Sequence, residues 1–419
     1  MLGVLDVLAK RGFVDSQTCD ELGVYLNAPR RVYIGYDPTA DSLHLGSLMG
    51  IIAARWFEQY GHTPIMLLGG ATGRIGDPSG KDKERPLLEE SQIDGNVAAI
   101  GKLFERFLDG PIVVNNLDWL GKFSLIDFLR DVGKQFRMGP MLSKESVKRR
   151  LESDEGMSFT EFTYQMMQGY DFYHLYKERG VSLQLGGSDQ WGNIVAGVEF
   201  TRRLSGDAVH GMTFPLLTRS DGKKFGKSEA GAIWLTEDKT SVYDFYQYLF
   251  RVSDDDVIKM MRLLTFMEMD EIEAIEKSMS SDGYVANSAQ IRLAEEVTRF
   301  VHGDAGLEKA KQVTIAAKPG AEMDLDVTTL RKLANDFPTA ELEIDSVVGQ
   351  KYVDVCVAIG LLPSKGEASR LIKNSGAYLN NKKVTDISKT IGQDDLLGEQ
   401  YLVFGAGKKK KMLLQIKKP

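Results

Sequence analysis

The chain has 419 residues, of which 43% are hydrophobic and 26% charged, and its formal net charge is −7. That length supports two or three domains with at least one large core. No apolar run approaches the roughly 18–20 residues of a membrane helix. The two cysteines lie far apart and the five histidines are scattered, which argues against a disulfide scaffold or a zinc site. We therefore expect a cytoplasmic protein with no membrane contact and no metal of its own.

The first residues, MLGVLDVLAKRGFVDS, lack a basic segment before an apolar block, so they predict an amphipathic helix and not a signal peptide. Nearly continuous apolar runs then alternate with helical patterns such as 48–60 and 97–108. Strands buried on both faces and separated by helices indicate a mostly parallel α/β sheet, whose ligands bind beyond the carboxyl ends of the strands. The expected strands are 30–37, 64–70, 111–116 and 181–187.

The second half of the chain has a different pattern. Residues 241–318 are predicted to be helical, with Asp or Ser as a plausible cap before several amphipathic runs. A loosely structured linker is expected at 319–345, and a small α/β unit after it. Residues 350–419 hold thirteen basic and six acidic side chains, which leaves −14 on the rest of the chain. A basic end on an acidic body is typical of polyanion binding, and a solvated tail is the alternative on charge alone.

The segment YIGYDPTADSLHLGS, residues 33–47, joins an expected strand to an expected helix. Such a junction directs backbone N–H groups and the positive helix end toward an anion. Gly46 leaves space for a flat ring or a ribose, and His44 can donate hydrogen bonds to phosphate oxygens. A structural histidine at a helix start is the alternative, because His-x-Gly alone is a weak signal.

A second loop, DGKKFGKSEAG, places Lys224 and Lys227 three residues apart between glycines. Such a loop can close over a triphosphate and bring two ammonium groups to charge that develops in a transition state. A basic surface loop is the common alternative. Because the loop DGKKFGKSEAG follows the His44 loop on an expected α/β sheet, the two loops together favour a nucleotide-binding site.

The segments HLGS and KFGKS resemble the His-x-Gly-His and Lys-Met-Ser-Lys-Ser signatures of class I aminoacyl-tRNA synthetases. Four segments are similar to the bacterial-type tyrosyl-tRNA synthetase family, and the likeness covers essentially the whole chain: YDPTADSLHLG, GGATGRIGDPSG, EFTYQMMQGYDF and LGGSDQWGNI. The resemblance implies a Rossmann-like parallel-sheet catalytic domain, then an α-helical domain on the anticodon side and a small C-terminal α/β RNA-binding domain like that of a ribosomal protein. The implied divisions are 1–218 (catalytic), 219–240 (lysine loop and linker), 241–318 (helical), 319–345 (linker) and 346–419 (RNA-binding).

The same resemblance implies a homodimeric ligase that joins tyrosine and ATP into tyrosyl-adenylate and pyrophosphate, with Mg²⁺ accompanying ATP. Tyrosine then passes to the 3′ end of tRNA(Tyr). Catalysis would rest on positioning and charge stabilisation, because the reaction needs no protein nucleophile. The implied transition-state contacts are His44, Lys224 and Lys227, followed by Lys81 and Arg85 of a mobile cationic loop.

Three hydrogen-bonding residues, Tyr164, Gln168 and Asp171, have i, i+4, i+7 spacing and share one helical stripe. Beside methionines and aromatic residues, such a stripe suits a polar ligand with an aromatic body, and a wet surface face is the alternative. In the family, Asp171 and Tyr33 would bond the phenolic hydroxyl of the substrate, and Tyr164 and Gln168 would bond its ammonium group. Phenylalanine, which has no such hydroxyl, would therefore be rejected. The implied tyrosine pocket consists of Tyr33, Asp77, Tyr164, Gln168, Asp171 and Gln190.

The resemblance also implies a set of ATP-binding residues. They are Gly35, Asp37, Thr39, His44, Gly46, Ser47, Gly187, Asp189 and Lys227. Ser47 departs from the family, which usually has a second histidine there. A serine hydroxyl is shorter but can still bond a ribose oxygen, or it can cap the following helix. We expect altered ATP handling and not a loss of activity.

Near the end of the chain, LLPSKGEASRLIKNSGAYLNNKKV resembles an RNA-binding fold first described in a small-subunit ribosomal protein. Its cations are spaced to follow a phosphate backbone, here the long variable arm of the tRNA. The candidate RNA contacts are Lys365, Arg370, Lys373, Lys408, Lys409, Lys410 and Lys411. Three alternatives stay open: a tryptophanyl relative, a small-molecule adenylyltransferase without tRNA binding, and a non-catalytic RNA-binding protein.

Overall fold

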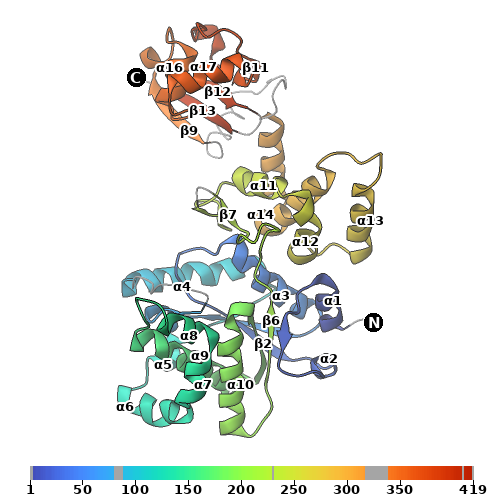
Figure 1. Cartoon of the computed structure of the whole chain (residues 1–419), viewed down its shortest axis with the longest axis vertical. Coiled ribbons are helices and arrows are strands. Elements are labelled where there is room, and N and C mark those ends of the chain that lie inside the picture. Colours follow the sequence, from blue (N-terminus) through green and yellow to red (C-terminus); the bar gives the residue numbers. More distant parts are fainter. Residues whose placement is uncertain (1–2, 80–87, 229–230, 317–337, 408–409, 418–419) are drawn as a thin grey trace. The chain divides into compact units, whose positions relative to one another are not determined.

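The structure, a computed structural model, describes residues 3–79, 88–228, 231–316, 338–407 and 410–417. The chain forms two compact units, Met1–Thr236 with Val252–Leu293 and Glu237–Arg251 with Ala294–Pro419. The first unit contains a six-stranded sheet, and the second contains a five-stranded sheet near the C-terminus (Figure 1). Within the described ranges, no helix is both long enough and apolar enough to span a bilayer.

The large sheet has the strand order β1-β6-β5-β2-β3-β4, and every neighbouring pair is parallel except β1 with β6. The four expected strands are confirmed to within two residues. The sequence pattern did not predict β6, whose short run HGMTF is interrupted by glycine and threonine. The strands are β1 (Ser16–Gln17), β2 (Arg31–Tyr36), β3 (Thr63–Leu68), β4 (Ile112–Asn115), β5 (Val181–Gly187) and β6 (His210–Phe214).

Helices cover both faces of this sheet, which explains the continuous apolar runs in its strands. Tyr33 of β2 packs in one cluster with Phe172 and Leu175 of helix α9, whereas the next residue, Ile34, contacts helix α3 near Gly50. Successive strand residues point to opposite faces, so α9 and α3 lie on opposite sides of the sheet. The helices are α1 (Val4–Arg11), α2 (Leu22–Tyr25), α3 (Leu48–Gln59), α4 (Glu90–Phe104), α5 (Leu117–Leu120), α6 (Leu125–Asp127), α7 (Met138–Ser143), α8 (Glu145–Leu151), α9 (Phe159–Arg179) and α10 (Trp191–Ser205).

Short helical turns complete this part of the first unit. They are η1 (Leu45–Ser47), η2 (Thr72–Arg74), η3 (Phe128–Val132), η4 (Gly133–Gln135) and η5 (Ser188–Gln190). Turn η5 follows β5 directly, η2 begins a few residues after β3, and η1 leads into α3. These turns therefore carry polar residues at the carboxyl edge of the sheet, where a ligand is expected.

The region after the large sheet is helical, as its amphipathic pattern predicts. A short hairpin precedes it, formed by β7 (Lys227–Ser228) and β8 (Gly231–Ala232). The helices are α11 (Val242–Phe250), α12 (Asp254–Leu264), α13 (Met269–Met279) and α14 (Ser288–Ala316). Gly303, with φ of 72°, interrupts α14 because only glycine adopts that backbone conformation readily.

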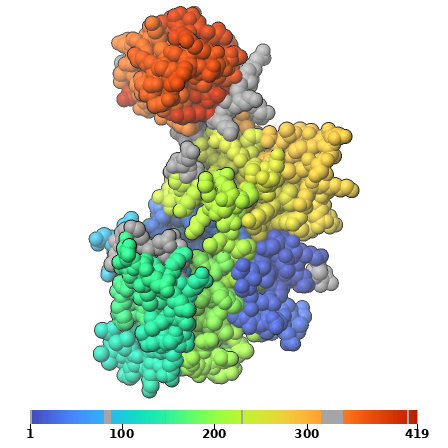
Figure 2. All heavy atoms as spheres, in the orientation of Figure 1, coloured from blue at the N-terminus to red at the C-terminus, as the bar shows by residue number. Residues whose placement is uncertain are grey.

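The C-terminal sheet has the order β11-β10-β12-β13-β9 and encloses a core of its own around Tyr352, Phe404 and Leu414, seen as a compact body in Figure 2. Strand β9 comes from within the segment 319–345 that the sequence suggested as a linker, and it pairs in parallel with β13. The elements are β9 (Thr339–Glu343), η6 (Ile344–Ser346), α16 (Tyr352–Ala358), α17 (Lys365–Lys373), β10 (Ala377–Leu379), β11 (Lys382–Lys383), η7 (Gln393–Asp395), β12 (Tyr401–Ala406) and β13 (Lys410–Lys417).

Candidate active site

A cavity of about 390 Å³ lies at the carboxyl edge of the large sheet. All the predicted tyrosine-pocket and ATP-binding residues line it, together with three of the five predicted catalytic residues. They are Tyr33, Gly35, Asp37, Thr39, His44, Gly46, Ser47, Asp77, Tyr164, Gln168, Asp171, Gly187, Asp189, Gln190, Lys224 and Lys227. A larger cavity, of about 600 Å³, is lined by only one of these predicted residues, Asp189. The smaller cavity is therefore the candidate site.

One end of the cavity is formed by Asp171 and Tyr33, which are 2% and 1% exposed. Asp171 accepts hydrogen bonds from Asn116 Nδ2 at 3.0 Å and from Trp119 Nε1 at 2.7 Å. Burial raises the pKa of Asp171 to about 7, and those two hydrogen bonds oppose the shift. Burial, aided by the charge of Asp171, also raises the pKa of Tyr33. The Tyr33 hydroxyl is buried and has no hydrogen-bond partner among the described residues.

Asn116 and Trp119, which hold the carboxylate of Asp171, were not among the residues predicted from the sequence. Asn116 ends the expected strand 111–116, and a polar side chain at that edge was a usable signal. Trp119 gave no such signal, because its place beside Asp171 depends on how α5 packs against α9. The ring of His174 stacks on Trp119 with centroids 4.3 Å apart, which restricts the indole further.

The middle of the cavity is a chain of amide and carboxylate groups. Gln168 Nε2 donates to Gln190 Oε1 at 3.3 Å, and Gln190 Nε2 donates to Asp77 Oδ2 at 2.6 Å. Tyr164 does not join this chain; its hydroxyl donates to Asp37 Oδ2 at 2.9 Å. Burial and the nearby Asp37 raise the pKa of Tyr164. The chain offers carboxylate and amide oxygens, which are suitable partners for an ammonium group.

At the start of α3, His44 is exposed on the cavity wall and its Nδ1 accepts a hydrogen bond from the backbone N–H of Ser47 at 3.2 Å. That bond assigns the proton of the neutral ring to Nε2. Ser47 Oγ lies 3.3 Å from the same Nδ1, and Ser47 makes no side-chain cap hydrogen bond to α3. The capping alternative for Ser47 is therefore wrong, because its hydroxyl lies against the histidine ring.

The two signature loops are in direct contact. Gly226, with φ of 87°, lies so close to the other loop that a Cβ there would stand 3.1 Å from the backbone nitrogen of Gly46. The backbone N–H of Leu45 also donates to Ile233 O at 2.7 Å. Lys224 and Lys227 are exposed on the cavity wall. The fold thus brings the His44 loop and the two lysines to one mouth of the cavity.

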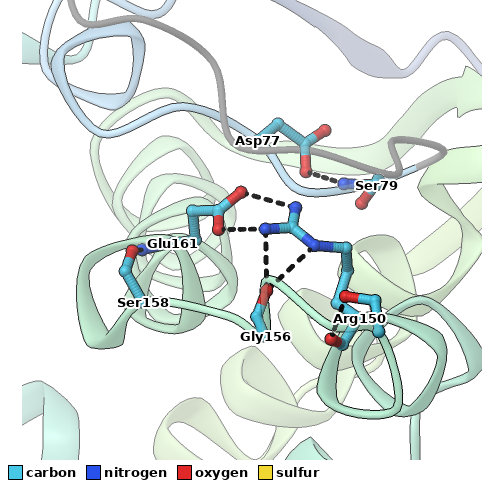
Figure 3. A network of polar contacts seen from close by, with 7 residues as sticks. Asp77, Ser79, Arg150, Gly156, Ser158 and Glu161 are labelled. Atoms are coloured by element: carbon cyan, nitrogen blue, oxygen red, sulfur yellow. Dashed lines mark hydrogen bonds and ion pairs between the residues drawn. The ribbon is translucent and has the colours of Figure 1, made fainter.

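A buried ion pair stands near the start of α9, the helix that carries Tyr164, Gln168 and Asp171 (Figure 3). Arg150 donates to both carboxylate oxygens of Glu161, at 2.8 and 2.7 Å, and the two side chains are 2% and 4% exposed. Arg150 Nη2 also donates to Gly156 O at 3.0 Å. A bidentate pair with these extra bonds fixes the first turn of α9 relative to α8.

The remaining candidates fall into three groups. Lys81, Arg85, Lys408 and Lys409 lie outside the described residues. Lys365, Arg370 and Lys373 are exposed on α17, and Lys410 Nζ donates to Leu361 O at 2.5 Å. Lys411 is only 7% exposed, its ammonium donates to Asn381, and burial lowers its pKa to about 8. That burial contradicts the expectation of an RNA contact at Lys411.

Within the described part of the chain, no three His, Cys, Asp or Glu side chains cluster in a way that could hold a metal ion. A carboxylate set for a divalent cation would need several such oxygens around one point. Three carboxylates of the cavity, Asp37, Asp77 and Asp171, accept hydrogen bonds from hydroxyl, amide and indole donors, as described above.

Comparison with known proteins supports the interpretation of this cavity. Residues 26–317 match the family described as tRNA synthetases class I (W and Y), and residues 329–414 match the tyrosine–tRNA ligase SYY-like C-terminal domain. The chain is 51% identical to the tyrosine–tRNA ligase of Protochlamydia amoebophila, over 99% of both proteins. It is 49% identical to the chloroplastic/mitochondrial tyrosine–tRNA ligase of Arabidopsis thaliana, over 99% of this chain and 83% of that protein.

A solved structure agrees with these matches. The C-terminally truncated mitochondrial tyrosyl-tRNA synthetase of Aspergillus nidulans superimposes with a TM-score of 0.67 at 32% identity, covering 75% of this chain and 93% of that one. The resemblance drawn from the loop signatures is thereby confirmed. By its sequence, its fold and the residues that line its cavity, the chain belongs to the class I tRNA synthetases of the tryptophanyl and tyrosyl group.

Proposed function

We propose that this protein is a tyrosine–tRNA ligase, which activates tyrosine with ATP and then esterifies tRNA(Tyr). The observation that carries the proposal is the buried Tyr33 hydroxyl beside the carboxylate of Asp171. A phenolic hydroxyl donates to the carboxylate and accepts from Tyr33, so it satisfies both groups at once. Phenylalanine leaves both without a ligand partner, and indole has an N–H donor but no acceptor for Tyr33.

In the first step, a carboxylate oxygen of tyrosine attacks the α-phosphorus of ATP in line. The bond from that phosphorus to the bridging oxygen breaks, and pyrophosphate leaves with the electron pair. Gln168, Gln190 and Asp77 hold the substrate ammonium, which places its carboxylate toward the loop mouth. His44 Nε2–H, Lys224 and Lys227 are positioned to stabilise the negative charge that develops on the phosphate oxygens.

Magnesium enters this proposal with ATP, where it neutralises phosphate charge. Lys81 and Arg85 are proposed as further contacts to pyrophosphate, on the resemblance alone. Glycines at 35, 46 and 187 line the cavity where the nucleotide is proposed to lie. At Gly187 a Cβ would stand 2.6 Å from Asp189 Oδ1, so glycine leaves this carboxylate room to accept from ribose hydroxyls.

In the second step, a hydroxyl of the terminal ribose of the tRNA attacks the activated carbonyl, and AMP leaves. The proposed RNA-binding domain, residues 346–419, presents Lys365, Arg370 and Lys373 along the exposed side of α17. Cations on one helix face suit a phosphate backbone. We propose the helical segment 241–318 for the anticodon side, the segment 1–218 for catalysis with the lysine loop in 219–240, and the cytoplasm as the compartment.

We also propose that the protein is a homodimer that pairs through an apolar surface of the first unit. Its residues belong to α6, η3, α7, α8 and α9 (teal in Figures 1 and 2), and the last four of these elements share one buried apolar cluster. Phe159 and Leu125 are 72% and 71% exposed there. Monomeric proteins rarely expose so many large apolar side chains together, and a second copy is the simplest cover. The surface consists of Leu125, Ile126, Leu129, Met138, Leu142, Leu151 and Phe159.

The test is amino-acid-dependent ATP–pyrophosphate exchange with tyrosine, phenylalanine and tryptophan. A buried group left without a partner costs about 1–3 kcal/mol. Bound phenylalanine leaves the Tyr33 hydroxyl in that state, whereas Asp171 keeps its bonds from Asn116 and Trp119, so phenylalanine should be disfavoured by a factor between about 5 and 140. Ser47→His, measured in parallel, should change the KM for ATP and leave the KM for tyrosine unaltered. Folded protein that exchanges with none of the three amino acids would refute the proposed function.

A further inference from the structure

The loop that carries the two lysines begins as a small hairpin. Thr218 and Lys224 form an antiparallel bridge across it. The backbone N–H of Phe225 donates to Leu217 O at 2.8 Å, and the Phe225 side chain is 5% exposed. The backbone of Lys224 is therefore fixed by the hairpin, and the position of the hairpin decides from which point its side chain extends.

Helix α12 holds this hairpin through Asp256, a carboxylate that is 3% exposed. The backbone N–H of Ser220 donates to Asp256 Oδ1 at 2.8 Å, and the Ser220 hydroxyl lies 3.3 Å from Oδ2. Ser253 Oγ donates to the same Oδ2 at 2.8 Å. Hydrogen bonds to a charged acceptor are about twice as strong as neutral ones, so this is a firm attachment.

The same helix makes a second contact one turn later. Lys259, three residues after Asp256, lies on the same face of α12. Its Nζ donates to Thr218 O at 3.0 Å, on the residue that pairs with Lys224. The hairpin is thus held at two points of its first strand and turn: Asp256 accepts from Ser220, and Lys259 donates to Thr218.

Local helix capping does not account for Asp256. Ser253 is the N-cap residue of α12, and its side chain makes no cap hydrogen bond to the helix backbone. The Ser253 hydroxyl instead donates to Asp256, whose only backbone donor among the described residues is Ser220 of the hairpin. A buried carboxylate that serves a neighbouring segment has a positioning role toward that segment.

We propose that Asp256 is a positioning residue for adenylate formation, because it fixes the hairpin so that Lys224 and Lys227 meet the phosphates of ATP. Lys259 supports the same placement through Thr218, which lies two residues before Ser220 and pairs with Lys224 on the opposite strand. This inference rests on the proposed function, which assigns the two lysines to the transition state. Neither Asp256 nor Lys259 lines the cavity, so both act through the loop and not on the substrate.

The experiment compares Asp256→Ala with the matched control Asp255→Ala, an exposed carboxylate in the same first turn of α12. A small misplacement of charged groups can cost about a hundredfold in rate. We expect Asp256→Ala to lower kcat of pyrophosphate exchange by about 10- to 100-fold, with the KM for tyrosine unchanged. Asp256→Asn should retain much of the rate, because its amide oxygen still accepts from the backbone of Ser220.

A second measurement is independent of activity. Limited trypsin digestion, with fragments mapped by mass spectrometry, should cut after Arg219, Lys223 or Lys224 several-fold faster in Asp256→Ala and in Lys259→Met than in Asp255→Ala. Lys259 is exposed, so its variant tests the attachment even if Asp256→Ala does not fold.

The outcomes separate the two proposals. If the unaltered protein exchanges pyrophosphate but Asp256→Ala and Lys259→Met match the control in kcat and in cleavage, the positioning role is refuted. If the unaltered protein shows no exchange, the proposed function fails, and the cleavage rates still decide whether α12 holds the loop.

Discussion

Replacing Tyr33 by phenylalanine removes one oxygen atom from the cavity, and it should change stability and substrate affinity in opposite directions. The hydroxyl is buried, with no hydrogen-bond partner among the described residues. A buried polar group in that state costs about 1–3 kcal/mol. The variant also loses the packing contacts of that oxygen. We therefore expect the free energy of unfolding of the ligand-free protein to rise by about 1 kcal/mol, the low end of the range.

Tyrosine should bind the same variant more weakly. The substrate loses one hydrogen bond, worth about 0.5–1.5 kcal/mol net, so the KM for tyrosine should rise about 2- to 13-fold. Phenylalanine leaves the Tyr33 hydroxyl unpaired in the natural protein but finds no such group in the variant. Discrimination between the two amino acids should therefore narrow, while the KM for ATP should not change.

Thermal unfolding and pyrophosphate exchange measure the two effects. A gain of about 1 kcal/mol corresponds to a rise of about 2 °C in the unfolding midpoint. Tyr352→Phe is the control, because that hydroxyl donates to Tyr378 O and lies 3.3 Å from Gly405 O. Its removal should lower the midpoint and leave exchange unaltered. A lower midpoint for Tyr33→Phe, or an unchanged preference for tyrosine over phenylalanine, would refute the reasoning.

Three further predictions concern other parts of the first unit. Glu161→Gln leaves the buried guanidinium of Arg150 without its countercharge, so urea unfolding should show a loss of about 3–5 kcal/mol; an unchanged midpoint would contradict this. The pKa of Asp171, about 7, lies above its usual value, so the carboxylate that accepts from tyrosine forms only as pH rises through 7. The KM for tyrosine should thus fall roughly tenfold between pH 6 and 8, and Asp171→Asn should abolish that dependence. The free energy of unfolding should decline from about pH 4 to 7, because Asp171 is fully ionised over that range only in the unfolded state. Phe159→Asp places a charge on the apolar surface, and sedimentation should detect monomers where the unaltered protein forms dimers; a natural monomer would refute the dimer.

Several parts of the active site followed from sequence because their signals are local. Apolar runs ending in Gly, Asp or Asn located the strands, and the edge of a parallel sheet collects whatever polar residues follow them. The spacing of Tyr164, Gln168 and Asp171 placed them on one stripe of a helix, and all three line the cavity. Periodicity and turn chemistry depend on neighbours within a few residues, so they can be read without a fold.

Other features depended on contacts between distant segments, which no local pattern encodes. Asn116 and Trp119 meet Asp171 only because α5 packs beside α9. The Ser47 hydroxyl lies against His44 and does not cap α3, and the sequence did not predict that contact. Lys411 looks like one cation of a basic tail, yet strand pairing buries it.

The sequence alone was enough to predict the order of the functional segments along the chain. They are an anion-binding junction, a polar helix stripe, a lysine loop and a basic end. The tertiary structure decided which of these groups meet and which partners each one has. The reason is physical: residue type and spacing set local conformation, whereas hydrogen-bond partners, burial and pKa depend on packing between segments far apart in the chain. The attachment of the lysine hairpin to Asp256 is such a contact between distant segments.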